Sequence, residues 1–341
     1  MPILRLSYFS LPARLKACFA YLSFYPKVEQ INCEYLVYLW IGEGFIPAGE
    51  GQWDVAWDCI NHLANLCLLQ VWDRYEDRPG CKLTNYCRTR DFLHDLAITI
   101  SKQNKYIFSV EEASCKGEND DCYRILLGIK DVNDAQISER HPVSLRTLSL
   151  SQNWWITSIP GNLFTAMRGL RVLDLSGTGI AKFPQSLERI KFLKVLNLND
   201  TEIEKVPKCV RHLKSFLFLA LPQGCMKLPI WINEIKCLQH LECKGVRRMP
   251  KGMSNMIALR TLHLHWLELS SEHDGFMRPE DFVNITQLQE LWTVKELELP
   301  KKMTTMKDLE SLILLRFTTG SWICDMANLR ELELKCCGGS D

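Results

Sequence analysis

The chain has 341 residues, of which 47% are hydrophobic and 24% charged, the composition of a globular protein long enough for two domains. A formal net charge of +1 argues against a general affinity for nucleic acid, and no window of about 18 uncharged apolar residues predicts a membrane span. The fifteen cysteines are scattered without a C-x-x-C pair, and no apolar run typical of a signal peptide is present, so we expect reduced thiols and a cytoplasmic protein.

Residues 1–110 have the pattern of helices followed by a hairpin. Ser10-Leu11-Pro12 predicts a helix start, and LKACFAYLSFY after it has apolar residues at helical spacing. INCEYLVYLWIGEGF predicts a second helix ended by Gly42 or Gly44, and VAWDCINHLANLCLL a third. VWDRYEDRPGCKLTNYCRTRDF predicts two short strands around a turn at Arg78-Pro79-Gly80, and DLAITISK begins a fourth helix. This order predicts an α-helical winged-helix domain.

Many winged helices bind DNA, but the charge of this segment disfavours that function. Residues 1–110 contain eleven Lys and Arg and eleven Asp and Glu, a net charge of zero. A surface that binds phosphates needs an excess of positive charge. We therefore expect no nucleic-acid partner.

Residues 111–142 are predicted to be an acidic linker. They contain eight acidic and four basic residues, whereas residues 143–341 contain 26 basic and 21 acidic ones. The opposite signs would favour contact between these parts of the protein, although the excess over the second segment is small.

From residue 143 onward the chain is repetitive. The pattern L-x-x-L-x-L begins at Leu145, Leu170, Leu193, Phe216, Leu238, Leu259, Leu288, Leu309 and Leu329, at spacings of 20 to 29 residues. This range is typical of leucine-rich repeats, in which each unit adds a short parallel strand and a looser return segment. The fold class is therefore a winged helix followed by an α/β leucine-rich-repeat horseshoe of about nine repeats over 143–341. The longest unit contains the polar stretch Ser270–Phe282, which we expect to leave the stack as a loop.

The residues between the leucines are predicted to line a concave sheet. One column contains Glu242, His263, Trp292 and Ile313, and His265 lies in the column beside it. This face is either a mixed solvated surface or a protein-binding surface with Trp292 as its aromatic anchor. His263 and His265 with Cys243 lack a fourth ligand at a suitable spacing, so we expect no metal site.

Three stretches, read in order, resemble a known family. SYFSLPARLKACFAYLSFYP, LVYLWIGEGFI and CRTRDFLHDLA, followed by leucine-rich repeats, resemble the plant nucleotide-binding leucine-rich-repeat (NB-ARC–LRR) disease-resistance proteins. The LW-x-x-EGF stretch is typical of the branch with an N-terminal coiled coil. The resemblance covers essentially the whole chain and implies the C-terminal part of such a receptor, with residues 1–110 as the winged-helix part of the nucleotide-binding module.

The resemblance assigns a nucleotide-sensing role to part of CRTRDFLHDLA. Aligned on Asp95-Leu96-Ala97, the family's Met-His-Asp triplet falls on Thr89-Arg90-Asp91. In the family the histidine faces the ADP phosphates and the aspartate caps the next helix. Arg90 could contact a phosphate more strongly than a neutral histidine, or it could be a substituted surface residue. Asp91 is expected to bond the free amides of the helix start. Catalysis by Cys87 and His94 is not expected, because no third group accompanies them.

No G-x-x-x-x-G-K-[ST] phosphate loop is present in the sequence, so we expect no tight binding of ADP or ATP by this chain alone. The predicted function is that of part of an intracellular immune receptor rather than an enzyme. ADP or ATP would switch the intact receptor, and its protein partner would be an effector, a guarded host protein or its own nucleotide-binding module. The alternative is a leucine-rich-repeat adaptor that presents a protein client without nucleotide switching.

Overall fold

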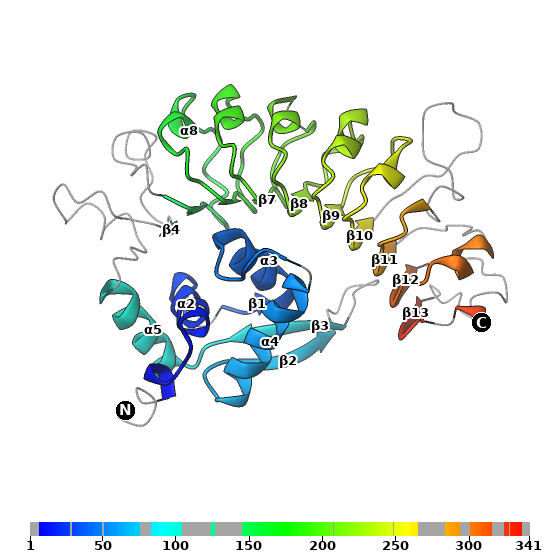
Figure 1. The fold of residues 1–341 in the computed structure, drawn as a ribbon. Helices are drawn as coiled ribbons and strands as arrows, with labels where there is room; N and C mark the ends of the chain where they lie inside the picture. The colour runs from blue at the N-terminus through cyan, green and yellow to red at the C-terminus, as the bar shows by residue number, and fades with distance from the viewer. Residues whose placement is uncertain are drawn as a thin grey trace, which may run out of the picture. The chain divides into compact units, whose positions relative to one another are not determined.

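The computed structural model describes residues 7–27, 29–49, 51–75, 83–103, 124–126, 145–206, 208–247, 249–264, 284–293, 301–315, 324–326 and 328–335. The chain forms two compact units (Figure 1). The first comprises Met1–Asp77, Leu83–Leu150 and Ala166–Leu173, and the second Arg78–Lys82, Ser151–Thr165 and Asp174–Asp341. Within the described residues, no helix has both the length and the apolar character needed to cross a bilayer.

The helices of the first unit follow the predicted order, as α2 (Ala13–Tyr21), the 3-10 helix η1 (Leu22–Phe24), α3 (Cys33–Glu43), α4 (Gln52–Asn65) and α5 (Asp91–Gln103). Pro12 precedes α2, where its missing amide costs no helical hydrogen bond. The Asn32 side chain accepts a hydrogen bond from the Tyr35 amide at 2.9 Å and so caps α3. Gly44 ends α3 with a φ of +86°, in the left-handed region that favours glycine. Of the two glycines expected to stop this helix, Gly44 is the one that does so.

The hairpin of the winged helix consists of β2 (Gln70–Tyr75) and β3 (Leu83–Arg88), which pair antiparallel. A short strand that the sequence analysis missed, β1 (Ile31–Asn32), pairs antiparallel with β3 and completes a sheet in the order β1-β3-β2. The expected turn at Arg78-Pro79-Gly80 lies outside the described residues. α5 begins at Asp91, four residues before the start that DLAITISK had suggested. The predicted winged helix is confirmed.

Aromatic side chains dominate the core of the winged helix. Trp40, Tyr21, Tyr38 and Phe19 are among the largest fully buried side chains of the described residues. The rings of Tyr38 and Trp53 lie 4.7 Å apart between α3 and α4. Burial of one such side chain contributes about 2 kcal/mol, so this core holds α2, α3 and α4 together.

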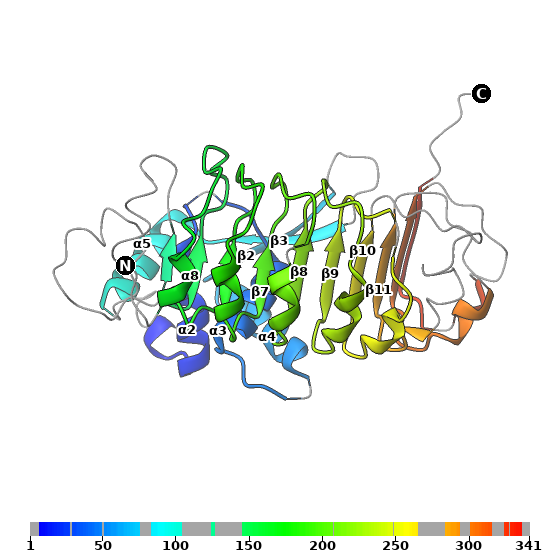
Figure 2. The same ribbon diagram turned by 90° about the horizontal axis from the view of Figure 1, so that it is seen from above.

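The repeat strands are, in chain order, β5 (Thr147–Ser149), β6 (Val172–Asp174), β7 (Val195–Asn197), β8 (Phe218–Leu221), β9 (His240–Cys243), β10 (Thr261–Leu264), β11 (Glu290–Thr293), β12 (Ser311–Leu315) and β13 (Glu331–Lys335). They coincide with the nine L-x-x-L-x-L stretches and stand side by side (Figure 2). A tenth strand, β4 (Arg124–Leu126), lies in the segment that the sequence predicted to be a linker and pairs in parallel with β5. The leucine-rich-repeat solenoid is confirmed.

The return segments contain short 3-10 helices rather than long α-helices. They are η2 (Gln185–Arg189), η3 (Lys208–His212), η4 (Ile230–Glu234), η5 (Met253–Asn255) and η7 (Lys301–Thr305), with a four-residue α-helix, α8 (Leu163–Ala166), in the first repeat. Pro184 and Pro229 precede η2 and η4 in extended conformation, which sets the direction of each arc. Between the strands and the arcs lies a leucine core in which Leu173, Leu196 and Leu219 are fully buried. The predicted loop Ser270–Phe282 lies outside the described residues.

Candidate functional sites

Thr89-Arg90-Asp91 lies at the junction between β3 and α5. Thr89 is buried, whereas Arg90 and Asp91 are exposed. The Arg90 carbonyl accepts hydrogen bonds from the amides of Leu93 and His94, both at 2.9 Å, so Arg90 occupies the cap position. Asp91 is the first helical residue, where its carboxylate is favoured by the positive end of the helix dipole. The cap of α5 is therefore Arg90, one residue before the expected Asp91.

The helix that follows this triplet is anchored to the N-terminal helices. His94 is buried, and its Nε2 donates to the Tyr25 carbonyl at 2.6 Å. The hydroxyls of Ser23 and Ser101 lie 2.8 Å apart, and Ser101 also donates to the Ala20 carbonyl at 3.0 Å. These buried contacts fix α5 against α2 and η1, so the exposed Arg90 side chain is held at a rigid junction.

Cys87 has the properties of a structural thiol. It is fully buried in β3, next to the thiol of Cys33. A hydrogen bond with Cys33, reinforced by burial, raises the pKa of Cys87 well above its ordinary value. The thiol is therefore protonated at neutral pH, whereas a nucleophile requires the thiolate. The His94 ring is engaged with the Tyr25 carbonyl.

The Glu-Gly pair of LW-x-x-EGF has a defined environment within the first compact unit. The Glu43 side chain is 1% exposed and accepts a hydrogen bond from the Thr147 hydroxyl. The Arg171 guanidinium donates to the Glu43 carbonyl at 2.7 Å. A Cβ placed on Gly44 would lie 2.7 Å from Nη1 of Arg171, so a larger residue there would displace the guanidinium. Burial, and then the charge of Arg146, lower the pKa of Arg171, while the Glu43 charge opposes this change.

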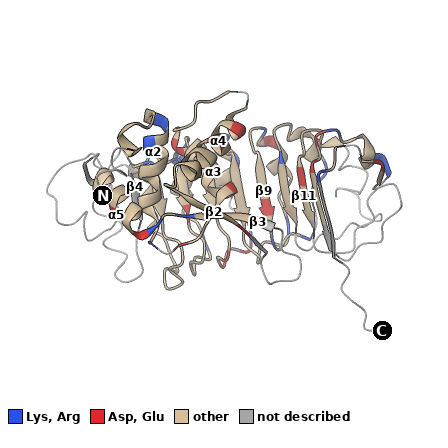
Figure 3. Ribbon diagram, turned by 90° about the horizontal axis from the view of Figure 1, so that it is seen from below, with Lys and Arg blue, Asp and Glu red and all other residues tan. Residues whose placement is uncertain are grey.

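The predicted concave column is present in the parallel sheet. Glu242, His263, Trp292 and Ile313 are paired in register on strands β9 to β12. Ile313 and His263 are buried, at 1% and 9% exposure, whereas Glu242 and Trp292 are half-buried. Acidic residues are visible on strands β9 and β11 (Figure 3). His265 lies outside the described residues.

A row of stacked rings crosses this sheet. The ring centroids of Phe218 and His240 lie 4.5 Å apart in nearly parallel planes. Edge-to-face contacts of 4.9 Å from His240 to His263, and of 5.2 Å from His263 to Trp292, continue the row. We call Phe218, His240, His263 and Trp292 the ring row. It spans four neighbouring strands, so these side chains restrain one another. Phe218, His240 and His263 are buried, and the half-buried Trp292 is the most accessible ring of the row.

Polar groups fix the histidines of the ring row. His263 Nε2 lies 2.7 Å from an oxygen of the buried Glu290, and His240 Nδ1 hydrogen-bonds the Thr261 hydroxyl. Two residues beyond β7, Asn199 donates to Glu242 of β9 at 3.1 Å, across the intervening strand β8. The surface therefore combines an aromatic centre with a polar margin, as protein-binding surfaces do. Sequence reasoning missed Phe218, His240 and Glu290, which precede the inner leucine of their repeats.

Among the described residues, no group of three His, Cys, Asp or Glu side chains is arranged to hold a metal ion. Ten described cysteines are outside any disulfide.

Together these features define a class of protein in which a winged helix is followed by leucine-rich repeats. The winged helix exposes Arg90 between β3 and α5, and the repeats contain the ring row. A family model described as the winged-helix domain of disease-resistance proteins matches residues 24–97, and one described as a leucine-rich repeat region matches residues 134–278. The chain belongs to the plant nucleotide-binding leucine-rich-repeat disease-resistance proteins, of which it contains the winged helix and repeats.

Individual relatives agree with this assignment. The chain is 27% identical over 278 residues to disease resistance RPP13-like protein 4 of Arabidopsis thaliana, covering 77% of this chain and 31% of that protein. It is 31% identical over 184 residues to the putative disease resistance protein RGA1 of Solanum bulbocastanum, covering 52% of this chain and 17% of that protein. The chain thus spans less than a third of the length of these relatives.

Solved structures agree on the fold of the repeats. An internalin (inlF) from Listeria monocytogenes aligns with a TM-score of 0.52 at 16% identity, over 64% of each chain. The Arabidopsis receptor kinase HAESA, solved with a peptide hormone and a co-receptor, aligns with a TM-score of 0.50 at 20% identity, over 62% of this chain and 42% of that one. At these identities the likeness describes architecture alone.

Proposed function

We propose that the chain is the gating and recognition part of an intracellular plant immune receptor that switches between ADP and ATP. The winged helix senses the nucleotide, and the repeats recognise a protein and restrain the receptor at rest. The half-buried Trp292 and Glu242 carry this proposal, since the buried rings and the paired strands hold them in place in a family named for disease resistance. The free thiols of the described cysteines support a reducing compartment such as the cytoplasm.

The gate is proposed to act through Arg90. Its side chain is exposed at a junction that buried hydrogen bonds hold in place. A guanidinium there can bind a phosphate oxygen of a nucleotide held mainly by the phosphate loop of an intact receptor. Because arginine is longer than the family's histidine and always charged, we expect a resting state less tightly closed than with histidine.

A chimera tests the gate. This chain is joined to the coiled coil and nucleotide-binding module of an intact family member, and resting cell death in leaves is measured together with the ADP retained on purification. Arg90→His should lower resting activity and raise the ADP content. Arg189→His, an exposed change in a repeat arc, is the matched control and should alter neither. Equal values for all three proteins would favour the adaptor function, without nucleotide switching.

A second experiment tests the recognition surface, with the isolated nucleotide-binding module as the probe. Trp292→Ala should leave the circular-dichroism spectrum unchanged, because Trp292 points away from the leucine core, and should weaken binding of the module about 30-fold or more. Trp154→Ala is the control, since Trp154 is 74% exposed and lies outside the ring row. Loss of folded structure in Trp292→Ala would show that this side chain belongs to the core. Equal binding by both variants would place the restraint on another surface.

A further inference from the structure

Charge is distributed unevenly along the repeats. Residues 182–260 contain fifteen Lys and Arg against six Asp and Glu, a net charge of +9. Residues 261–341 contain eight against fourteen, a net charge of −6. The two opposite excesses nearly cancel in the net charge of the whole chain, which is +1. A folded segment with such an excess of cations attracts an anionic partner.

The cations of residues 182–260 form rows because the repeats are in register. Three lysines, Lys191, Lys214 and Lys236, have the same place in successive repeats. They lie four residues before Val195, Phe218 and His240, which pair with one another across β7, β8 and β9. All three lysines are exposed. They stand at the turn from each arc into its strand, and adjacent strands are about 4.8 Å apart. The three ammonium groups therefore belong to one surface.

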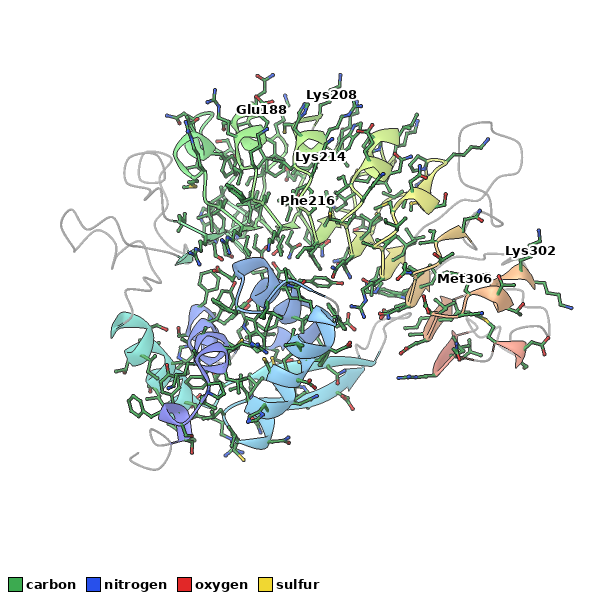
Figure 4. All side chains as sticks on the ribbon, viewed as in Figure 1. Glu188, Lys208, Lys214, Phe216, Lys302 and Met306 are labelled. Atoms are coloured by element: carbon green, nitrogen blue, oxygen red, sulfur yellow. The ribbon has the colours of Figure 1, made fainter. Side chains whose placement is uncertain are left out.

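The arcs contribute further positive charge. Lys208 and Lys251 are exposed at the starts of the arcs of η3 and η5. Figure 4 shows Lys208 on the outer side of the arcs and Phe216 toward the core. Arg211 donates to both carboxylate oxygens of Glu234, at 2.9 and 3.2 Å, so this acid is already neutralised. Cations predominate over acids on the arc surface as well as in the turns.

Large apolar side chains are exposed among these cations. Phe192, Ile230 and Ile257 are 62%, 73% and 65% exposed. Phe192 follows Lys191 directly. Ile257 lies four residues before Thr261 of β10, the same place that each lysine of the row has before its own strand. Ile230 occupies in η4 the position that Lys208 has in η3. We call Lys191, Lys208, Lys214, Lys236 and Lys251, with these three apolar residues, the basic arc.

We propose that the basic arc binds the surface of an anionic lipid membrane without crossing it. The lysines would meet the headgroups, and the three apolar side chains would enter the boundary between headgroups and acyl chains. Nucleic acid would engage the cations, but two of the three exposed apolar side chains, Ile230 and Ile257, are aliphatic and cannot stack on bases, so the mixture of the two residue types favours lipid. This inference is independent of the proposed immune function.

The test uses the purified full chain and sedimentation with vesicles of phosphatidylcholine alone or with about 30% phosphatidylserine. Each lysine near an anionic leaflet strengthens binding about fivefold, so K191E/K214E/K236E should weaken binding to the anionic vesicles at least about 100-fold. The matched control is K301E/K302E/K307E, with three equally exposed lysines, since Lys307 has the same place before β12. This control should keep most of the binding. Phe192→Ser/Ile257→Ser should weaken binding even at low salt.

Binding to anionic vesicles that falls with added salt and is lost in the first triple variant supports the proposal. Equal loss in both triple variants would overturn it, because general charge would then explain the attraction. Failure of the wild-type chain to sediment with either vesicle would also overturn it. Binding of a 20-base-pair duplex through the same lysines, without vesicle binding, would identify nucleic acid as the partner. Circular dichroism of each variant checks that it is folded.

Discussion

Gly44→Ala tests the packing around the Glu-Gly pair that ends α3. Gly44 has a φ of +86°, and an alanine in this left-handed conformation costs about 1 kcal/mol. The new Cβ would also lie 2.7 Å from Nη1 of Arg171, which donates to the Glu43 carbonyl at 2.7 Å. The guanidinium is the mobile end of a half-buried side chain, so moving it off the Glu43 carbonyl costs about 1 kcal/mol more. We therefore expect the free energy of unfolding to fall by about 2 kcal/mol.

Urea unfolding followed by tryptophan fluorescence measures this change, since Trp40 is buried in α3. Gly161→Ala is the control, because a Cβ there meets nothing within 4 Å, and it should cost less than about 0.5 kcal/mol. In an Arg171→Ala background, Gly44→Ala should cost only the backbone part, which gives a coupling of about 1 kcal/mol. A cost for Gly44→Ala no larger than that of the control, or an undiminished cost without Arg171, would refute the role of the guanidinium.

Three further predictions concern the winged helix. His94→Phe removes the hydrogen bond to the Tyr25 carbonyl and should destabilise the protein by about 2 kcal/mol in the same unfolding assay, whereas Lys27→Ala, which breaks an exposed ion pair with Asp95, should cost less than about 1 kcal/mol. A hydrogen bond with Cys18 lowers the pKa of Cys59, burial raises it, and the charge of Arg14 lowers it further. Arg14→Ala should therefore shift iodoacetamide labelling of Cys59 to higher pH. An unchanged pH profile of labelling would contradict this. Calorimetry should show that the purified chain binds ADP no more tightly than about millimolar, and micromolar binding would mean that residues other than a phosphate loop hold the nucleotide.

The sequence determined the repeat architecture because the signal is local. In L-x-x-L-x-L the alternation places leucines on one face of each strand, and nine such stretches at spacings of 20 to 29 residues require a stack that buries them. The same reasoning placed Glu242, His263 and Trp292 in one column, which the pairing of β9, β10 and β11 reproduces. Helical spacing and capping residues likewise predicted the helices of the winged helix. These sequence signals did not predict β1, because a strand of two residues has no periodicity and is defined only by its pairing with β3.

Tertiary structure decided which side chains act together. The ring row joins residues 22 to 29 positions apart along the chain, and it crosses from the column of Phe218 and His240 to that of His263 and Trp292. Glu43 meets Arg171 across 128 positions, a contact that no local pattern encodes. Local pattern specifies which face of an element is buried, whereas the partner on that face depends on how distant segments pack.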